Sequence, residues 1–149
     1  MMTDVNFSTV RLGAEHIPFA HEIEKSCFSD PWSEKSLGLF TGAGGVGLIC
    51  FSNGIPAAYC GVMTVLDEAD IARIATVPAF RRMGVAKRLL GSLFGLLASM
   101  NVSRVTLDVR ESNIPALELY RSSGFAVIGK RRDYYNRPRE AAVIMEKKL

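Results

Sequence analysis

The sequence predicts a single α/β domain with a mixed, mostly antiparallel central sheet of about seven strands and helices on both faces. Its 149 residues match the usual length of one domain and contain no linker-like stretch, so we expect one domain over residues 1–149. The chain is 48% hydrophobic with a net charge of only +3, which favours a packed core over disorder. Segments of strand and helix periodicity follow one another in the order β-α-α-β-β-β-α-β-α-β-β, which is typical of such a fold.

A short strand and two helices are expected in the first part of the chain. Val5 to Leu12 is expected to form the strand, and His16 to Phe28 a helix with its apolar residues along one side. Asp30-Pro31 ends that helix, because proline fixes its own backbone and keeps the preceding residue out of helical geometry. A second short helix is expected over Trp32 to Phe40.

Three strands are expected after a glycine-rich loop. Gly47 to Phe51 and Ile55 to Val65 are predicted to form a hairpin, because Asn53-Gly54 between them is a strong turn signal. Glu68 to Val77 is the third strand, and Pro78 ends it.

The clearest helix of the chain is expected over Val85 to Met100, where apolar side chains recur along one face. A shorter helix over Ile114 to Ser122 has a capping residue, Asn113, before its start and Gly124 after its end. The remaining strands are expected over Val105–Arg110, Phe125–Asp133 and Ala141–Lys147.

Charge is divided unevenly along the chain. Residues 1–70 hold 3 basic and 9 acidic side chains, whereas residues 71–149 hold 15 basic and 6 acidic side chains. This asymmetry is compatible with an anion bound by the second half, and equally with ordinary solvated surface charge.

The cysteines and the lack of long apolar runs indicate a cytoplasmic protein. Cys27, Cys50 and Cys60 cannot all pair with one another and sit among apolar neighbours, so we expect reduced, buried thiols. No apolar run approaches the ~20 residues of a membrane helix, and Met1 to Arg11 lacks the features of a signal peptide. No metal is expected, because the histidines, cysteines and carboxylates show neither zinc-site nor calcium-loop spacing.

The stretch from Ile74 to Lys87 carries the strongest chemical signal. A strand ends, a loop with Arg81 and Arg82 follows, and the clearest helix begins directly after Gly84. The first amides of a helix have no partners within it, and with the helix dipole they form an anion site suited to a diphosphate. Neither a P-loop nor a dinucleotide-binding fingerprint is present.

Two motifs resemble the signature of the GNAT acetyltransferases. The first, Arg81-x-x-Gly84-x-Ala86, is similar to the acetyl-CoA loop of that family. The second, further along the chain, is Asn113-x-x-Ala116-x-x-Leu119-Tyr120-x-x-x-Gly124-Phe125. Other segments resemble the branch of the family that acetylates the N-terminal alanine of a ribosomal protein: Asp30-Pro31-Trp32-Ser33-Glu34, Leu107-Asp108-Val109-Arg110-x-Ser112-Asn113 and Arg132-x-Tyr134-Tyr135.

The resemblance implies acetyl-CoA as the acetyl donor, bound between two splayed strands. In the family, a bulge separates the strand before the loop from the next strand, and the pantetheine arm lies between them. The backbone of Ile74, Ala75 and Thr76 would face that arm, and one of these amides would hold the thioester oxygen. Asn113 would contact the cofactor or serve only as a helix cap. The diphosphate would bind the amides of Arg82, Met83, Gly84, Val85, Ala86 and Lys87.

The resemblance also implies a base and an acid. A terminal amine, with a pKa of about 7.7–8.0, must lose a proton before it attacks, and the departing thiolate gains one. Tyr120 stands at the position of the family's usual acid. The base of this branch is a glutamate where this chain has Asp108, which is one methylene shorter, and Glu111 is the nearest alternative.

The acceptor is expected to be the N-terminus of a basic protein, by resemblance a small-subunit ribosomal protein. Tyr134 and Tyr135, with Trp32 and Phe28, are expected to form an aromatic groove for the peptide. Glu34 is expected to attract a basic one. Two other functions stay open: acetylation of a small-molecule amine, and acetyl-CoA binding without catalysis. The basic half lacks a helix-turn-helix or RNP-like pattern, so no nucleic-acid partner is expected, nor is a membrane partner.

Overall fold

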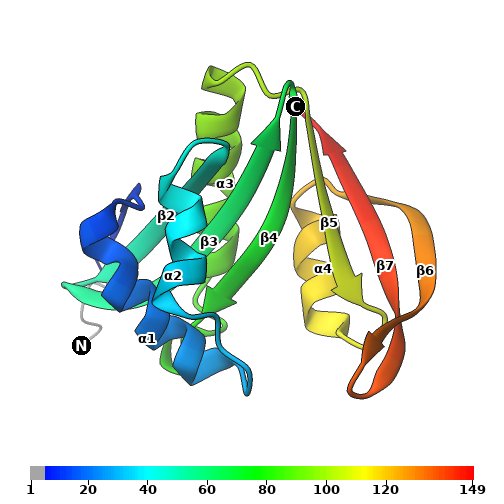
Figure 1. Ribbon diagram of the computed structural model, residues 1–149, viewed down its shortest axis with the longest axis horizontal. Coiled ribbons are helices and arrows are strands. Elements are labelled where there is room, and N and C mark those ends of the chain that lie inside the picture. The colour runs from blue at the N-terminus through cyan, green and yellow to red at the C-terminus, as the bar shows by residue number, and fades with distance from the viewer. Residues whose placement is uncertain (1–5) are drawn as a thin grey trace.

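The computed structural model describes residues 6–149 and has the predicted order of seven strands and four α-helices (Figure 1). Val5, expected to begin the first strand, lies outside the described residues. The strands are β1 (Phe7–Arg11), β2 (Gly45–Ser52), β3 (Ile55–Val65), β4 (Glu68–Thr76), β5 (Arg104–Arg110), β6 (Ala126–Asn136) and β7 (Arg139–Lys148). The α-helices are α1 (Ile17–Cys27), α2 (Glu34–Leu37), α3 (Val85–Ser99) and α4 (Ile114–Ser122).

The seven strands form one mixed sheet in the order β1-β2-β3-β4-β5-β7-β6. Every neighbouring pair is antiparallel except β4 and β5, which run parallel. The chain crosses between these two strands through α3, as parallel neighbours require. The predicted mixed, mostly antiparallel sheet is therefore confirmed.

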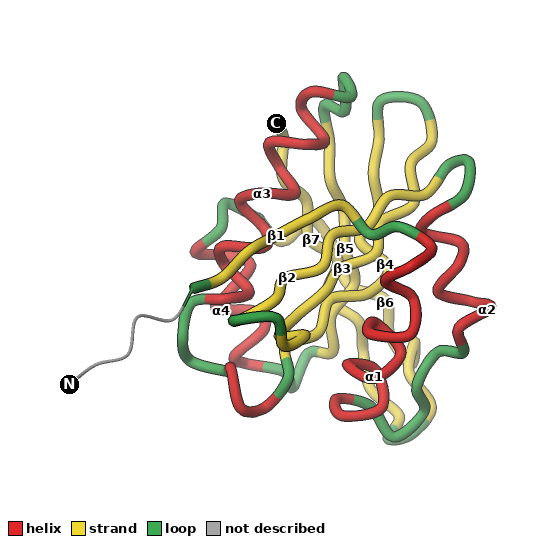
Figure 2. Tube along the Cα trace, turned by 90° about the vertical axis from the view of Figure 1, so that its left-hand side faces the viewer, coloured by secondary structure: helices red, strands yellow, loops and turns green. Residues whose placement is uncertain are grey.

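The helices cover both faces of the sheet, with α1 and α2 on one face and α3 and α4 on the other (Figures 1 and 2). Each face has its own apolar core. Ala20 and Ile23 of α1 pack with Tyr59 of β3 on the first face. Leucines of α3 and Tyr120 of α4 pack with apolar residues of β2 to β5 and β7 on the second face. The predicted arrangement of helices on both faces is confirmed.

The second helix begins later than expected. It was predicted from Trp32, but α2 starts at Glu34, because Ser33 is its N-cap and accepts a hydrogen bond from the Ser36 amide at 3.1 Å. Trp32 therefore lies in the connection between α1 and α2, where its ring stacks on that of Phe40 with the centroids 5.5 Å apart.

The final hairpin is longer than expected. The strands predicted to stop at Asp133 and to resume at Ala141 stay paired down to Asn136↔Arg139. Arg110 of β5 braces their turn by donating hydrogen bonds to the carbonyl oxygens of Arg137 and Pro138, at 3.3 and 3.1 Å. This long-range contact has no local sequence signal.

Strands β4 and β5 pair over a short length and then separate. Their register ends at Asp70↔Thr106, and beyond it the strands diverge (Figure 1). Ala72 of β4 is the extra residue of a bulge, since the register with β3 changes from Val62↔Ile71 to Gly61↔Arg73. A bulge bends its strand and increases the local twist, so it accounts for the gap that opens towards β5.

Candidate active site

A cleft of about 760 Å³ occupies the gap between β4 and β5. Its walls come from both strands, the α1–α2 connection, α4 and the β6–β7 turn. The structure thus brings together residues from distant parts of the sequence. The predicted site residues that line this cleft are Trp32, Ile74, Asp108, Asn113, Tyr120, Tyr134 and Tyr135.

Backbone groups of β4 face the gap where β5 has moved away. The amide of Val77 donates to the Ala57 carbonyl in β3 at 2.8 Å. Because successive residues of a strand alternate in direction, the amides of Ile74 and Thr76 point the other way, towards the gap. Ala75 was expected to share this role, but the same alternation directs its amide to β3. Two of the three predicted residues therefore present a donor to the gap.

A second cavity, of about 350 Å³, lies at the N-terminus of α3. Gly84 is the N-cap in left-handed geometry, with φ of 75°, which suits a residue without a side chain. The first hydrogen bond within the helix runs from the Arg88 amide to the Gly84 carbonyl, so the amides before it have no helical partner. The predicted residues that line this cavity are Thr76, Arg82, Gly84, Val85, Ala86 and Lys87.

Met83 is the one loop residue of the predicted set that does not line the second cavity. Its side chain is exposed to solvent. Arg81 joins the cavity wall instead, and its Nε donates to the Thr76 carbonyl at 3.1 Å. The cavity therefore combines unpaired helix amides with several cationic side chains, a combination suited to phosphate groups.

Tyr120 reaches the cleft from the face covered by α3 and α4. Its ring packs against Phe125, edge to face, with the ring centroids 5.8 Å apart. The residue is only 6% exposed, and burial raises the pKa of its hydroxyl well above the usual value. The hydroxyl is therefore held in its protonated form, the form that can donate a proton.

Asp108 reaches the cleft from the opposite face of the sheet. Its neighbours Leu107 and Val109 are buried on the α3 and α4 side, whereas Asp108 is exposed. Asp108 lines the same cleft as Tyr134 and Tyr135 of β6, and burial and the negative charge of Asp108 raise the pKa of Tyr135. The alternative base, Glu111, lies outside the cleft and forms an ion pair with Lys130 Nζ at 2.8 Å.

Asn113 caps a helix and also lines the cleft. Its Oδ1 accepts a hydrogen bond from the Ala116 amide at 3.2 Å, so it caps α4. It also lines the cleft between β4 and β5. Capping therefore fixes the start of α4 and leaves one edge of Asn113 at the cleft wall.

Aromatic side chains form part of the cleft wall. Trp32 lines the cleft from the α1–α2 connection, while Tyr134 and Tyr135 line it from β6. The two tyrosine rings meet edge to face with centroids 5.0 Å apart. Glu34 does not belong to this wall, because Ser33 caps α2 and leaves Glu34 exposed on the first turn, outside the cleft.

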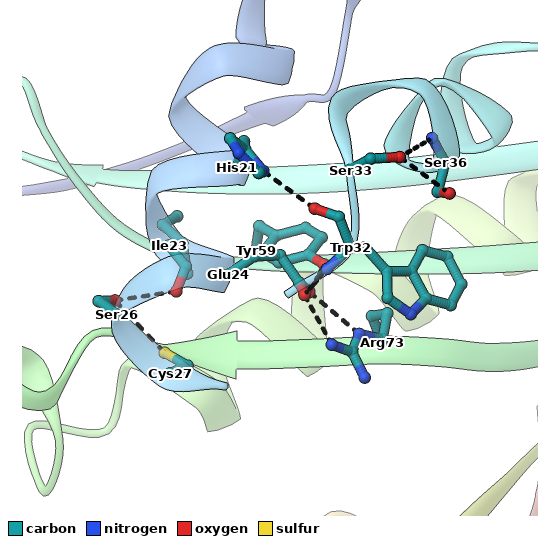
Figure 3. A network of polar contacts seen from close by, with 10 residues as sticks. All are labelled: His21, Ile23, Glu24, Ser26, Cys27, Trp32, Ser33, Ser36, Tyr59 and Arg73. Atoms are coloured by element: carbon teal, nitrogen blue, oxygen red, sulfur yellow. Dashed lines mark hydrogen bonds and ion pairs between the residues drawn. The ribbon is translucent and has the colours of Figure 1, made fainter. Parts of the chain in front are cut away.

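A buried ion pair beneath the aromatic wall was missed by the sequence reasoning (Figure 3). Glu24 of α1 is 0% exposed and pairs with Arg73 of β4, with 2.6 Å between Glu24 Oε1 and Arg73 Nη2. The hydroxyl of Tyr59 also donates to Glu24, and so does the Trp32 amide at 2.8 Å. Burial alone would raise the pKa of Glu24, but these hydrogen bonds outweigh it and lower that pKa. The sequence did contain one indication of this pair: Glu24 lies on the apolar face of its helix, together with Ala20.

Other features of the described residues bear on earlier expectations. The three cysteines are unpaired; Cys50 and Cys60 are buried as predicted, whereas Cys27 is only partly buried. Within residues 6–149, no helix is both long and apolar enough to cross a membrane. Over the same range, no group of three or more His, Cys, Asp and Glu side chains is arranged to hold a metal ion.

A sheet splayed beside a cationic helix start, with a donor-lined gap between the strands, defines an acyl-CoA-dependent N-acetyltransferase. The model of the acetyltransferase (GNAT) family matches residues 17–125, and the chain belongs to this family. Members of the family use acetyl-CoA as acetyl donor. The predicted resemblance and the predicted enzyme class are confirmed.

Relatives within the family are similar over most of their length. The chain is 37% identical to the [ribosomal protein bS18]-alanine N-acetyltransferase of Escherichia coli (strain K12), over 87% of this chain and 88% of the relative. It is 39% identical to the protein of that name from Haemophilus ducreyi, over 83% and 88%. The crystal structure of the ribosomal-protein-S18-alanine N-acetyltransferase from Escherichia coli superposes with a TM-score of 0.90 at 34% identity, covering 97% of this chain and 94% of that chain.

Proposed function

We propose that this protein transfers the acetyl group of acetyl-CoA to the α-amino group of the N-terminal alanine of ribosomal protein bS18. The observation that carries the proposal is the single cleft between β4 and β5, which joins a donor-lined gap to an aromatic wall with a carboxylate. Similarity to relatives named for this reaction supports the choice of acceptor.

In this proposal acetyl-CoA binds across both cavities. The amides of Val85, Ala86 and Lys87 precede the first helical hydrogen bond of α3 and bind the diphosphate. The pantetheine arm then lies along β4 in the place of a neighbouring strand. The amide of Ile74 or Thr76 binds the thioester oxygen and stabilises the negative charge that develops there. Asn113 contacts the arm from the far side of the gap.

The acceptor amine enters from the face where Asp108 lies. A terminal amine is largely protonated at pH 7, so Asp108 accepts its proton, directly or through a water molecule. The neutral nitrogen attacks the thioester carbonyl carbon and forms the C–N bond. The C–S bond then breaks, and the coenzyme A thiolate takes a proton from the Tyr120 hydroxyl. The second proton of the attacking nitrogen leaves through water and restores the Tyr120 hydroxyl. Because Asp108 and Tyr120 reach the gap from opposite faces, the proton acceptor and the proton donor stay apart.

The acceptor side of the cleft suits a peptide. Trp32, Tyr134 and Tyr135 supply flat surfaces on both sides of the entering chain. A basic ribosomal N-terminus, reached in the cytoplasm, is the acceptor in this proposal. Acetylation of a small-molecule amine and cofactor binding without catalysis are the competing functions.

A mass measurement distinguishes these functions. The protein is incubated with acetyl-CoA and a library of N-terminal peptides that includes the bS18 sequence beginning with alanine. We expect one added acetyl group on the α-amine of that peptide, and little on peptides with a blocked terminus but a free lysine. Acetylation of polyamines or aminoglycosides in preference to every peptide would support a small-molecule acceptor, and no transfer at all would support a binding module.

A further inference from the structure

The guanidinium of Arg73 is fixed in one orientation at the edge of the cleft. Glu24 binds it side-on, with Nε to Oε2 at 3.0 Å and Nη2 to Oε1 at 2.6 Å. Phe28 covers its face with 4.0 Å between the guanidinium carbon and the ring centroid, and Trp32 lies at 5.1 Å. These contacts leave the guanidinium little freedom to rotate.

One nitrogen of this guanidinium, Nη1, has N–H groups that are available to donate to another molecule. Nε and Nη2 form the edge that meets Glu24, so Nη1 lies on the opposite side of the group (Figure 3). Within residues 6–149, Nη1 makes no hydrogen bond, and it is not among the buried unsatisfied atoms. Since Arg73 lines the cleft, this nitrogen is accessible from it.

Arg73 stands next to the place where the proposed reaction occurs. It directly precedes Ile74, whose amide faces the gap. Its side chain points to the α1 face of the sheet, as its bonds to Glu24 show, and Asp108 is exposed on that face. When an amine attacks between β4 and β5, the groups bonded next to its nitrogen therefore lie close to Arg73.

We infer that Arg73 donates a hydrogen bond from Nη1 to the carbonyl oxygen of the first residue of the acceptor peptide. This inference rests on the proposed function. An α-amino acceptor always has a carbonyl two bonds from its nitrogen, whereas a polyamine or an aminoglycoside amine has none. Arg73 is thus a specificity-determining residue, and Glu24 is the positioning residue that aims it.

Two modified peptides test the inference on the unaltered protein. In one, an ester replaces the first peptide bond and keeps the carbonyl oxygen while losing the N–H. In the other, an E-alkene replaces the same bond and loses both. A charge-assisted hydrogen bond predicts that kcat/KM for the ester peptide exceeds that for the alkene peptide about tenfold to a hundredfold. Equal values would overturn the inference.

A double substitution separates the effect of Arg73 from the intrinsic chemical differences between the two peptides. Glu24→Gln with Arg73→Met removes both charges together, so that no buried charge is left unpaired. The alkene also changes the basicity of the amine, but this change is the same for both proteins and cancels between them. We expect the preference for the ester peptide to disappear in the double variant. A retained preference would assign the carbonyl contact to another group and overturn the inference.

Three further measurements complete the test. Arg104→Met is the matched control, because Arg104 also pairs with carboxylates but lies outside the cleft, and its ester preference should stay. Glu24→Gln alone should reduce the ester preference, which a purely structural role would not change. The Kd for acetyl-CoA should be unaltered in the double variant, and a large rise would assign Arg73 to the donor instead. If the unaltered protein acetylated no peptide, both the proposed function and the inference would fall.

Discussion

The hydroxyl of Thr106 donates a hydrogen bond to the carboxylate of Asp70 at 2.9 Å, at the last position where β4 and β5 pair. The bulge at Ala72 follows two residues later on β4, and from there the two strands separate. The contact therefore marks the closed end of the gap. Asp70 and Thr106 both lie on the face where Asp108 is exposed, so the closed end is polar on the acceptor side.

Asp70 should make the protein less stable at neutral pH. Burial raises the pKa of Asp70; the hydrogen bond from Thr106 opposes this rise, and the negative charge of Asp108 adds to it. A folded-state pKa above the unfolded value means that stability is highest below about pH 3.9 and is lost as pH rises through the folded pKa. We therefore expect Asp70→Asn to have a higher Tm than the unaltered protein at pH 7. The difference should vanish at the acid end of a pH series, and a lower Tm for the variant at pH 7 would contradict this reading.

Asp108→Asn tests the assignment of the base. Loss of a positioned proton acceptor should lower kcat/KM by roughly 10²–10⁴. The loss should shrink as pH rises, because more of the amine then arrives already deprotonated. Steady-state rates between pH 6 and pH 9 measure both effects, and a loss independent of pH would instead indicate that Asp108 positions the substrate.

Glu111→Gln is the matched control for that experiment. Glu111 stands in the turn after β5 but pairs with Lys130 outside the cleft, so its substitution should leave the rate nearly unchanged. If kcat/KM fell in Glu111→Gln and not in Asp108→Asn, the result would indicate that Glu111 accepts the proton after a movement of the turn.

Tyr120→Phe tests the assignment of the acid. The substitution keeps the ring that packs on Phe125 and removes only the hydroxyl. We expect kcat to fall roughly 10²-fold or more while the KM for peptide and the Kd for acetyl-CoA change little. Because burial raises the pKa of Tyr120, the unaltered enzyme should show no loss of the acid up to about pH 10. An unchanged kcat, with chemistry shown to limit the rate, would return Tyr120 to a packing role.

Ala86→Leu tests the anion site at α3. Leucine is a good helix former, so the helix is kept while the larger side chain enters the second cavity. We expect acetyl-CoA to bind roughly tenfold or more weakly by calorimetry. Ala98→Leu makes the same change on an exposed position near the other end of α3 and should bind normally. Binding to the unaltered protein should also weaken with added salt, because the phosphates are held by charge.

Local patterns predicted much of this molecule. The long apolar face of α3 and the turn signal at Asn53-Gly54 are properties of short stretches, so the corresponding helix and hairpin could be predicted. The loop that ends at Gly84 and the helix start beside it follow from a strand, a basic stretch and an apolar-faced helix in sequence. Strand alternation alone placed Asp108 on the face away from Leu107.

Contacts between distant residues could not be predicted in the same way. Glu24 and Arg73 are 49 residues apart, and the sequence around either residue does not indicate its partner. The β6–β7 hairpin was predicted too short because Arg110 of another strand braces its turn. The start of the second helix was expected too early, at Trp32, whereas the cap at Ser33 sets it at Glu34.

The central claim is that acetyl-CoA and the acceptor peptide meet in one cleft between β4 and β5. A conjugate that joins coenzyme A to the α-amine of the bS18 peptide through an acetyl bridge tests it most directly. Its Kd should be at least about 10²-fold lower than that of acetyl-CoA or of the peptide, because it resembles the state in which both are bound. Ala86→Leu at one end and Trp32→Ala at the other should each weaken it. A conjugate that binds no more tightly than acetyl-CoA, or that is insensitive to Trp32→Ala, would contradict the claim.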